Sequence, residues 1–224
     1  MGYTQTTLAD DKQAVSVGFV EVGGTGFNLT SLKLDVGSAK CNGDIYIEIL
    51  DSLGYTEQTY YWYQNSFGKD DGWYNDDDDM IGVDVDDIVF APGTGLWLTG
   101  IDGEELTTAG KVYQADISIP LADDKQMIGN PYAASIGLAA NVTIEMTGKS
   151  NGDVYIEMLD SLGYTEQTYY WYQNSFGKDD GWYNDDDDVI GDDVDDIIFP
   201  AGQGLWVTGL EGANFNITSP IPAN

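Results

Sequence analysis

An acidic segment that occurs twice carries the densest group of potential ligands in this chain. The first copy, at residues 70–87, includes the run Asp76–Asp79, and the second, at residues 179–196, repeats that run as Asp185–Asp188. Crowded carboxylates repel one another, and a hard cation relieves the repulsion by collecting about six to eight oxygen ligands. A divalent cation, with Ca2+ as the natural candidate, is therefore one hypothesis, and its expected ligands are Asp76, Asp78, Asp185 and Asp187.

Two other interpretations of the acidic segment stay open. Its spacing does not match an EF-hand loop, which needs alternating ligands, a central glycine and a terminal bidentate glutamate. A solvated acidic loop would keep a β-rich surface soluble and would block edge-to-edge pairing of sheets. Adaptation to high salt is the third interpretation, but the concentration of charge in expected loops favours a local role.

An aromatic segment, Thr59–Gln64, recurs as Thr168–Gln173. If it is a strand, one face carries Tyr60 and Trp62 and lines the core, whereas the opposite face exposes tyrosines beside the acidic segment. Exposed aromatic rings suit either a protein interface or stacking on sugar rings; alternatively, strands and loops cover both faces. The expected interface or binding residues are Tyr61, Tyr63, Trp73, Tyr74, Tyr170, Tyr172, Trp182 and Tyr183.

The charge and residue inventory excludes several classes of function. The net charge is −31, all eight basic residues are lysine, and the chain contains no arginine and no histidine. Such a surface repels nucleic acid and anionic membranes. Without histidine there is no Ser-His-Asp or Cys-His system and no imidazole ligand for a metal.

Carboxylate pairs could hydrolyse glycosides, but two small, nearly identical units lacking histidine and arginine make a poor hydrolase. We therefore expect no enzyme. The single cysteine, Cys41, is matched by Ser150 in the second copy, so we expect it to be a small residue at a strand edge without a repeated role.

The first residues contain neither a basic region nor an apolar stretch, so we predict no signal peptide in this sequence. No run of residues reaches the length of a membrane span. We expect an extracellular or virion-associated protein, which requires that a leader was removed or that release occurs by lysis or inside a particle.

Alternation of apolar and polar residues predicts an all-β fold. The apolar residues Val15, Val17 and Phe19 occupy every second position, as in a strand with one buried face. Ile45, Ile47 and Ile49 do the same and would share one strand face. The segment 51–54 predicts a turn with a positive φ at its glycine. We expect a polar loop over residues 65–79, resumed alternation over residues 81–90, a short strand at residues 96–98, and no helix longer than a turn or two.

A tandem duplication organises the chain. Residues 42–100 and 151–209 are equal in length and alike at about five positions in six, and Ala9–Gln13 returns as Ala122–Gln126. We predict two similar β-sandwich or small-barrel domains, at residues 1–110 and 111–224. Anything that one copy binds should be bound twice.

Two short motifs carry a resemblance to a group of proteins. Gly129-Asn130-Pro131-Tyr132 opens the second copy, and Pro200-Ala201-Gly202-Gln203-Gly204-Leu205-Trp206-Val207 closes it. In this respect the chain resembles uncharacterised tandem β-sandwich proteins of bacteria and their phages that carry NPY and AGQGxWV motifs. The first copy keeps the closing motif and lacks the opening one. The resemblance implies a β-sandwich with a surface or structural role and no chemistry.

These observations favour a non-enzymatic structural protein that assembles with itself or decorates a larger particle, such as a phage virion, a cell-surface layer or a filament. Two copies in one chain could occupy two quasi-equivalent positions of a lattice. The alternative is a bivalent, carbohydrate-binding protein, with or without Ca2+, in which two weak sites gain avidity.

Overall fold

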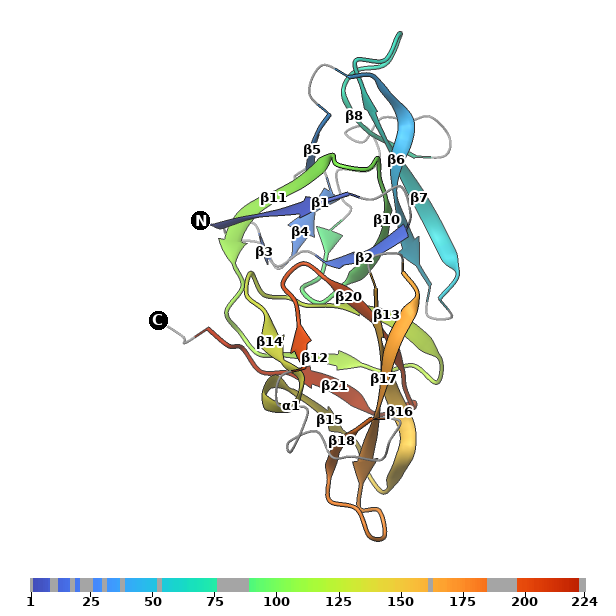
Figure 1. The fold of residues 1–224 in the computed structure, drawn as a ribbon, viewed down its shortest axis with the longest axis vertical. Helices are drawn as coiled ribbons and strands as arrows, with labels where there is room; N and C mark the ends of the chain where they lie inside the picture. Colours follow the sequence, from blue (N-terminus) through green and yellow to red (C-terminus); the bar gives the residue numbers. More distant parts are fainter. Residues whose placement is uncertain are drawn as a thin grey trace.

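The computed structural model describes residues 2–8, 12–16, 19–20, 26–29, 32–36, 39–51, 54–75, 89–160, 163–184 and 197–221. Nearly all regular structure in them is strand, so the predicted all-β class is confirmed. The molecule is elongated, with the N-terminal half above the C-terminal half and both termini on the same side (Figure 1).

The strands of the N-terminal half are β1 (Gly2–Thr7), β2 (Lys12–Ser16), β3 (Phe19–Val20), β4 (Phe27–Asn28), β5 (Lys33–Asp35), β6 (Cys41–Leu50), β7 (Thr56–Gln64), β8 (Gly72–Tyr74), β9 (Val89–Phe90), β10 (Gly95–Thr99) and β11 (Glu105–Val112). Those of the C-terminal half are β12 (Ile117–Pro120), β13 (Lys125–Gly129), β14 (Ile136–Gly137), β15 (Val142–Glu145), β16 (Ser150–Leu159), β17 (Thr165–Gln173), β18 (Gly181–Tyr183), β19 (Ile198–Phe199), β20 (Gly204–Thr208) and β21 (Asn214–Ile217). The helix α1 (Leu138–Asn141) is a single turn.

The two halves use corresponding strand orders. A five-stranded antiparallel sheet runs β2-β10-β6-β7-β8 in the first half and β13-β20-β16-β17-β18 in the second. A further sheet contains β1, β11, β3 and β5 in the first half, and its counterpart runs β12-β21-β15. Two short ladders, β4 with β9 and β14 with β19, also correspond. The sequence duplication is therefore matched by a duplication of strand order.

Alternation decides which side chains fill the two cores. In β6, Ile45 and Ile47 are fully buried and belong to one core cluster with Leu34 and Leu106, which joins the five-stranded sheet to its neighbour. In β16 the equivalent residues lie in a second cluster with Phe215 from β21. Burial of such side chains contributes roughly 1.5–3 kcal/mol each, which makes these clusters the main source of stability.

The β6–β7 hairpin confirms the predicted turn. The amide of Gly54 donates to the carbonyl of Asp51 at 3.0 Å, the Tyr55 amide donates to the Asp51 carboxylate at 2.8 Å, and Gly54 has φ of 77°. Glycine adopts this backbone conformation without steric cost. By contrast, the predicted loop over residues 65–79 is wrong in part, because residues 72–74 form β8, which pairs with β7.

The halves meet at a waist, defined here as the cluster of Ala14, Met127, Leu159 and Trp206 with Leu50 and Trp97. Its backbone contacts are reciprocal. The amide of Ser16 donates to the carbonyl of Gly202 at 2.9 Å, and the corresponding amide of Gly129 donates to the corresponding carbonyl of Gly93 at 2.8 Å. The donor and acceptor of one hydrogen bond are the repeat counterparts of the donor and acceptor of the other. The two halves are therefore related locally by a pseudo-twofold axis.

Candidate functional site

Among the described residues, the most exposed large apolar side chains lie on two hairpin tips, defined here as residues 65–71 and 174–180. The backbone amide of Asn65 donates to the Asp71 carboxylate at 2.7 Å, and its side-chain amide donates to the carbonyl of Ala39 at 2.9 Å. Asn65 has φ of 53°, a conformation that asparagine tolerates better than most residues. The second tip repeats both bonds, at 2.6 and 2.8 Å. Hydrogen bonds therefore hold the two tips in the same conformation.

A lysine and two tyrosines support the base of each tip. The ammonium nitrogen of Lys69 lies 4.1 Å from the ring centre of Tyr63 and 4.3 Å from that of Tyr74. The two rings meet edge to face at 4.9 Å, and the Tyr74 hydroxyl donates to the carbonyl of Asp70 at 3.1 Å. In the second tip, Lys178 lies 4.2 Å from each ring. Cation–π contacts of this kind contribute about 0.5–1 kcal/mol at exposed sites and fix the direction of the tip.

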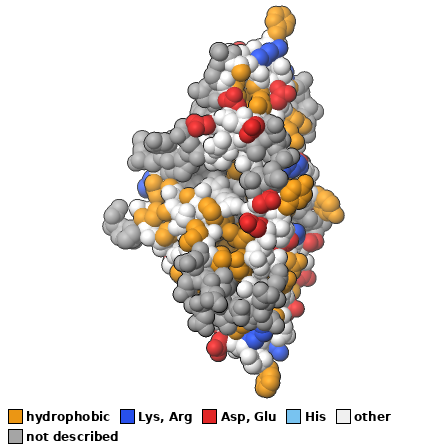
Figure 2. Space-filling view, viewed as in Figure 1, with side chains coloured by type: hydrophobic (Ala, Val, Ile, Leu, Met, Phe, Trp, Pro, Cys, Tyr) orange, Lys and Arg blue, Asp and Glu red, His pale blue; other side chains and the backbone are white. Residues whose placement is uncertain are grey.

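Phe67 and Phe176 stand on these tips with 100% relative exposure. The hairpins β7–β8 and β17–β18 lie at opposite ends of the molecule (Figure 1), and a hydrophobic side chain projects at each end (Figure 2). A fully exposed phenylalanine at an ordered turn buries no apolar surface in the core and so does not stabilise the fold. The arrangement instead presents two equal apolar contacts that face away from each other.

The structure corrects the expectation that Trp73 and Tyr74 are exposed. Trp73 retains 2% exposure, packs against Trp62 with ring centres 5.2 Å apart, and donates its indole N–H to the carbonyl of Leu32 at 3.2 Å. Tyr74 retains 5% exposure. The cause is β8, whose pairing with β7 places Trp73 on the core face opposite Trp62.

The second copy gives the same correction. Trp182 packs against Trp171 at 5.2 Å and donates to the carbonyl of Val142 at 3.0 Å, and Tyr183 retains 3% exposure. Neither tryptophan of these predicted sites presents a surface to a partner.

The remaining four predicted tyrosines lie half-buried on the outer face of the five-stranded sheets; they are Tyr61, Tyr63, Tyr170 and Tyr172. Tyr61 packs against Tyr46 at 5.8 Å, and Tyr170 packs against Tyr155 at 5.6 Å. The structure thus brings these tyrosines together with neighbours on one face, but it leaves only part of each ring accessible.

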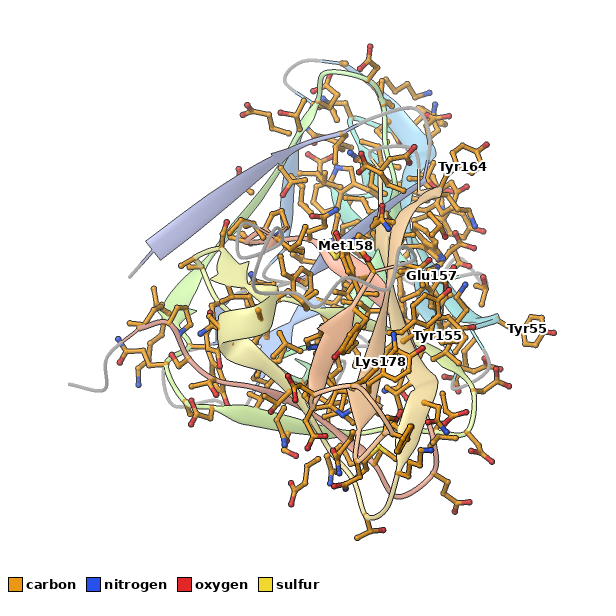
Figure 3. All side chains as sticks on the ribbon, turned by 60° about the horizontal axis from the view of Figure 1, so that its bottom comes forward. Tyr55, Tyr155, Glu157, Met158, Tyr164 and Lys178 are labelled. Carbon is orange, nitrogen blue, oxygen red and sulfur yellow. The ribbon has the colours of Figure 1, made fainter. Side chains whose placement is uncertain are left out.

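Two tyrosines that the sequence reasoning did not single out are more open. Tyr55 and Tyr164 are each 70% exposed at the ends of the β6–β7 and β16–β17 turns. In Figure 3 both project outward on the side of the molecule where Tyr155 and Glu157 lie. Glu157 there binds Lys125 at 2.5 Å and accepts a hydrogen bond from Thr165 at 2.9 Å.

The proposed metal ligands Asp76, Asp78, Asp185 and Asp187 lie outside the described residues, so the Ca2+ hypothesis stays a prediction. Within the described ranges, no group of three or more histidine, cysteine, aspartate or glutamate side chains is placed to hold a metal ion. Among the helices of that same part of the chain, none is long and apolar enough to cross a membrane.

The two phenylalanines were also missed by sequence reasoning, although a signal was present. Phe67 lies between Ser66 and Gly68 in a polar stretch, and Phe176 has the same neighbours in the second copy. An apolar ring flanked by turn-forming residues has no strand partner on which to pack. A phenylalanine between turn-forming residues is therefore a more direct signal of an exposed ring than alternation along a strand.

Comparison with protein-family models, with curated proteins and with solved structures yields no match for this chain. The resemblance based on the NPY and AGQGxWV motifs therefore stays a prediction, and the functional argument rests on the geometry of the molecule.

Proposed function

We propose that this chain is a non-enzymatic structural protein that assembles with itself, or decorates a larger particle, through its two hairpin tips. The observation that carries the proposal is the full exposure of Phe67 and Phe176 on identical, hydrogen-bonded tips at opposite ends of the molecule. In this view the chain consists of two β-sandwich repeats, residues 1–110 and 111–224, and each repeat supplies one tip.

Energetics support a contact role for the tips. Burying a phenylalanine side chain contributes roughly 1.5–3 kcal/mol, which is too little for a lasting contact on its own. Two such contacts on one rigid chain reinforce each other when both partners belong to one lattice or particle. Because the two tips lie at opposite ends of the molecule, one copy can contact two different neighbours. Two tips on the same side would instead favour binding to a single partner. The proposed setting is a virion, a cell-surface layer or a filament.

The test compares the mass of assemblies formed by the wild type, by Phe67→Ser, by Phe176→Ser and by the double variant. Light scattering and electron microscopy should show species larger than the monomer for the wild type at high protein concentration and at salt that screens the net charge of −31. Each single variant should form smaller or fewer assemblies than the wild type at the same concentration, because it keeps only one of its two tips. The double variant should remain monomeric.

A matched control is the pair Val89→Ser and Ile198→Ser. These residues correspond to each other in the repeat and are 54% and 48% exposed, so the changes remove two apolar side chains while leaving the tips intact. Assembly by this control should equal that of the wild type. A wild type that stays monomeric under all these conditions, or a double tip variant that assembles normally, contradicts the proposal.

A neutral-glycan-binding protein is the second candidate, and the 70% exposure of Tyr55 and Tyr164 favours it. Exposed tyrosine rings can stack on sugars, and the strong negative charge would repel anionic glycans. Screening on a glycan array, with and without Ca2+, should give binding that Tyr55→Ala with Tyr164→Ala abolishes. No signal on the array would remove this candidate.

A further inference from the structure

We propose that each exposed phenylalanine docks in a groove beside the waist of a second copy of this chain. The inference rests on the proposed self-assembly and names its partner surface. Beside the waist, a groove lies on each side of the pseudo-twofold, between a turn of one half and a strand of the other.

The first groove has a volume of about 320 Å3 and lies between the β9–β10 turn and strands β12 and β13. Its lining is predominantly apolar and contains no charged side chain; its apolar residues include Pro92, Ile119, Pro120 and Met127. In a chain with a net charge of −31, an uncharged apolar groove is a place where a second acidic copy can approach with least repulsion.

The floor of this groove is closely packed. Gly93 has φ of 89°, and a Cβ built on it would lie 2.7 Å from the Ile117 side chain and 2.8 Å from that of Ile119. The turn therefore presses directly onto β12, and the adjacent amide of Gly129 holds the Gly93 carbonyl at 2.8 Å. A groove with such a floor is preformed, so docking requires little rearrangement.

The second groove, of about 260 Å3, is the pseudo-twofold counterpart of the first. It is lined by Ala14 and Val15, which correspond to Met127 and Ile128, and by Gly202 and Gln203, which correspond to Gly93 and Thr94. It is more polar than the first because Gln13 and Asp160 also line it. We therefore expect the first groove to bind a tip more tightly than the second.

The charges on the tips favour the uncharged first groove over the second. Asp160 lines the second groove, and Asp51, its counterpart in the repeat, lines a hollow of about 200 Å3 that shares Thr94, Gln126 and Met127 with the first groove. In each tip one lysine, which packs over two tyrosine rings, is followed by two exposed aspartates, and a second, exposed lysine (Lys40 or Lys149) lies beside the segment that the tip asparagine binds. The tip aspartates would be repelled by Asp160 and Asp51, so a tip should enter the first groove from the side away from Asp51.

Site-specific photo-crosslinking tests the pairing on the intact chain. Benzoylphenylalanine replaces Phe67, the sample is irradiated at an assembling concentration, and mass spectrometry identifies the joined peptides. The expected crosslinks join position 67 to residues 91–94 or 118–128 of another copy, or to residues 13–15 or 201–203. Crosslinked oligomers joined only elsewhere, such as tip to tip, overturn this inference while leaving the proposed self-assembly intact.

Groove variants give a second readout. Ser118→Glu in the first groove together with Ala201→Glu in the second introduces charge where a phenyl ring would dock, and it should weaken self-association at least ten-fold. The control, Ala139→Glu with Thr143→Glu, adds the same charge at exposed positions outside both grooves and should change association less than two-fold. Equal effects of the two pairs overturn the pairing, and an absence of assembly in the wild type overturns the proposed function as well. Circular dichroism before assay confirms that each variant folds.

Discussion

The thiol of Cys41 and the hydroxyl of Ser150 occupy the same position in the two copies and make the same contact. Cys41 donates to the carbonyl of Trp62 at 3.2 Å, and Ser150 donates to the carbonyl of Trp171 at 2.7 Å. Both side chains are fully buried. The cysteine is therefore a structural hydrogen-bond donor, and its replacement in the second copy preserves the bond.

We predict that Cys41→Ser changes the free energy of unfolding by less than about 1 kcal/mol, because the serine can reproduce the bond that Ser150 makes. Urea denaturation of the variant and the wild type measures the difference. Because the thiol is buried, a thiol reagent should label the wild type only after unfolding. Rapid labelling of the native protein would contradict this account.

The NPY motif has a clear structural role in the second copy. The side-chain amide of Asn130 lies within 3.0 Å of the carbonyls of Ala134, Phe199 and Pro200, and its side-chain oxygen accepts from the Tyr132 amide at 3.0 Å. Asn130 thus links the start of the second copy to its β19 strand. We predict that Asn130→Asp lowers the free energy of unfolding by at least about 2 kcal/mol, because an aspartate carboxylate has no N–H to donate to these three carbonyls. Urea denaturation measures the difference.

Tyr132 gives a pH-dependent prediction. Burial, with a smaller contribution from the Asp116 carboxylate, raises the pKa of this hydroxyl well above its ordinary value of 10.0. The unfolded chain therefore releases the proton near pH 10 while the folded chain keeps it, so the associated stability is present below that pH and is lost as the pH rises above it. The free energy of unfolding should fall less steeply between pH 9 and 11 in Tyr132→Phe than in the wild type, and parallel falls would contradict the assignment.

At the scale of elements, the hairpin turns work as contacts between the halves. A Cβ built on Gly163 would lie 2.8 Å from the Lys12 carbonyl and 3.0 Å from the Trp97 ring, so the β16–β17 turn packs against the first half. Across the pseudo-twofold, Gly54 meets Trp206 of the second half in the same way, at 3.2 Å. Each turn therefore needs glycine both for its φ and for the space beside a tryptophan.

Gly163→Ala and Gly177→Ala form a matched pair, because their φ values are 78° and 77° but no atom lies within 4 Å of a Cβ on Gly177. Both variants incur the cost of a left-handed alanine, about 1–2 kcal/mol. We predict a further loss of at least about 1 kcal/mol for Gly163→Ala, since Trp97 or the β2 backbone must shift. Urea denaturation measures both losses, and equal values would show that the turn does not depend on this contact.

At the scale of the whole molecule, charge opposes both compactness and assembly. The chain has thirty-nine acidic side chains and only eight lysines. At physiological ionic strength, salt screens the repulsion between exposed carboxylates that are more than about 8–10 Å apart. The waist still joins the two halves, because apolar side chains and reciprocal backbone bonds form it. Stability and self-association should therefore respond to salt in the same direction.

We predict that the melting temperature rises between 10 mM and 300 mM NaCl. If the acidic segments hold Ca2+, millimolar CaCl2 should raise the melting temperature further than NaCl or MgCl2 does at equal ionic strength, and the excess should vanish when Asp76, Asp78, Asp185 and Asp187 become asparagine. Differential scanning calorimetry measures both effects. Equal curves for the three salts would remove the calcium hypothesis and leave general screening.

The sequence by itself determined the all-β class, several strands and turns, and the duplication, but not β8. Strand alternation at Ile45 and Ile47, the glycine of the Asp51–Gly54 turn and the repeat of residues 42–100 depend on local geometry, which a pattern of residue types records directly. Only the tertiary structure decided which aromatic rings are accessible, because exposure depends on partners distant in the chain. Trp73 is buried because β8 pairs with β7, whereas Phe67 has no opposing strand, and the pseudo-twofold that aims the two tips apart comes from contacts between the halves at the waist.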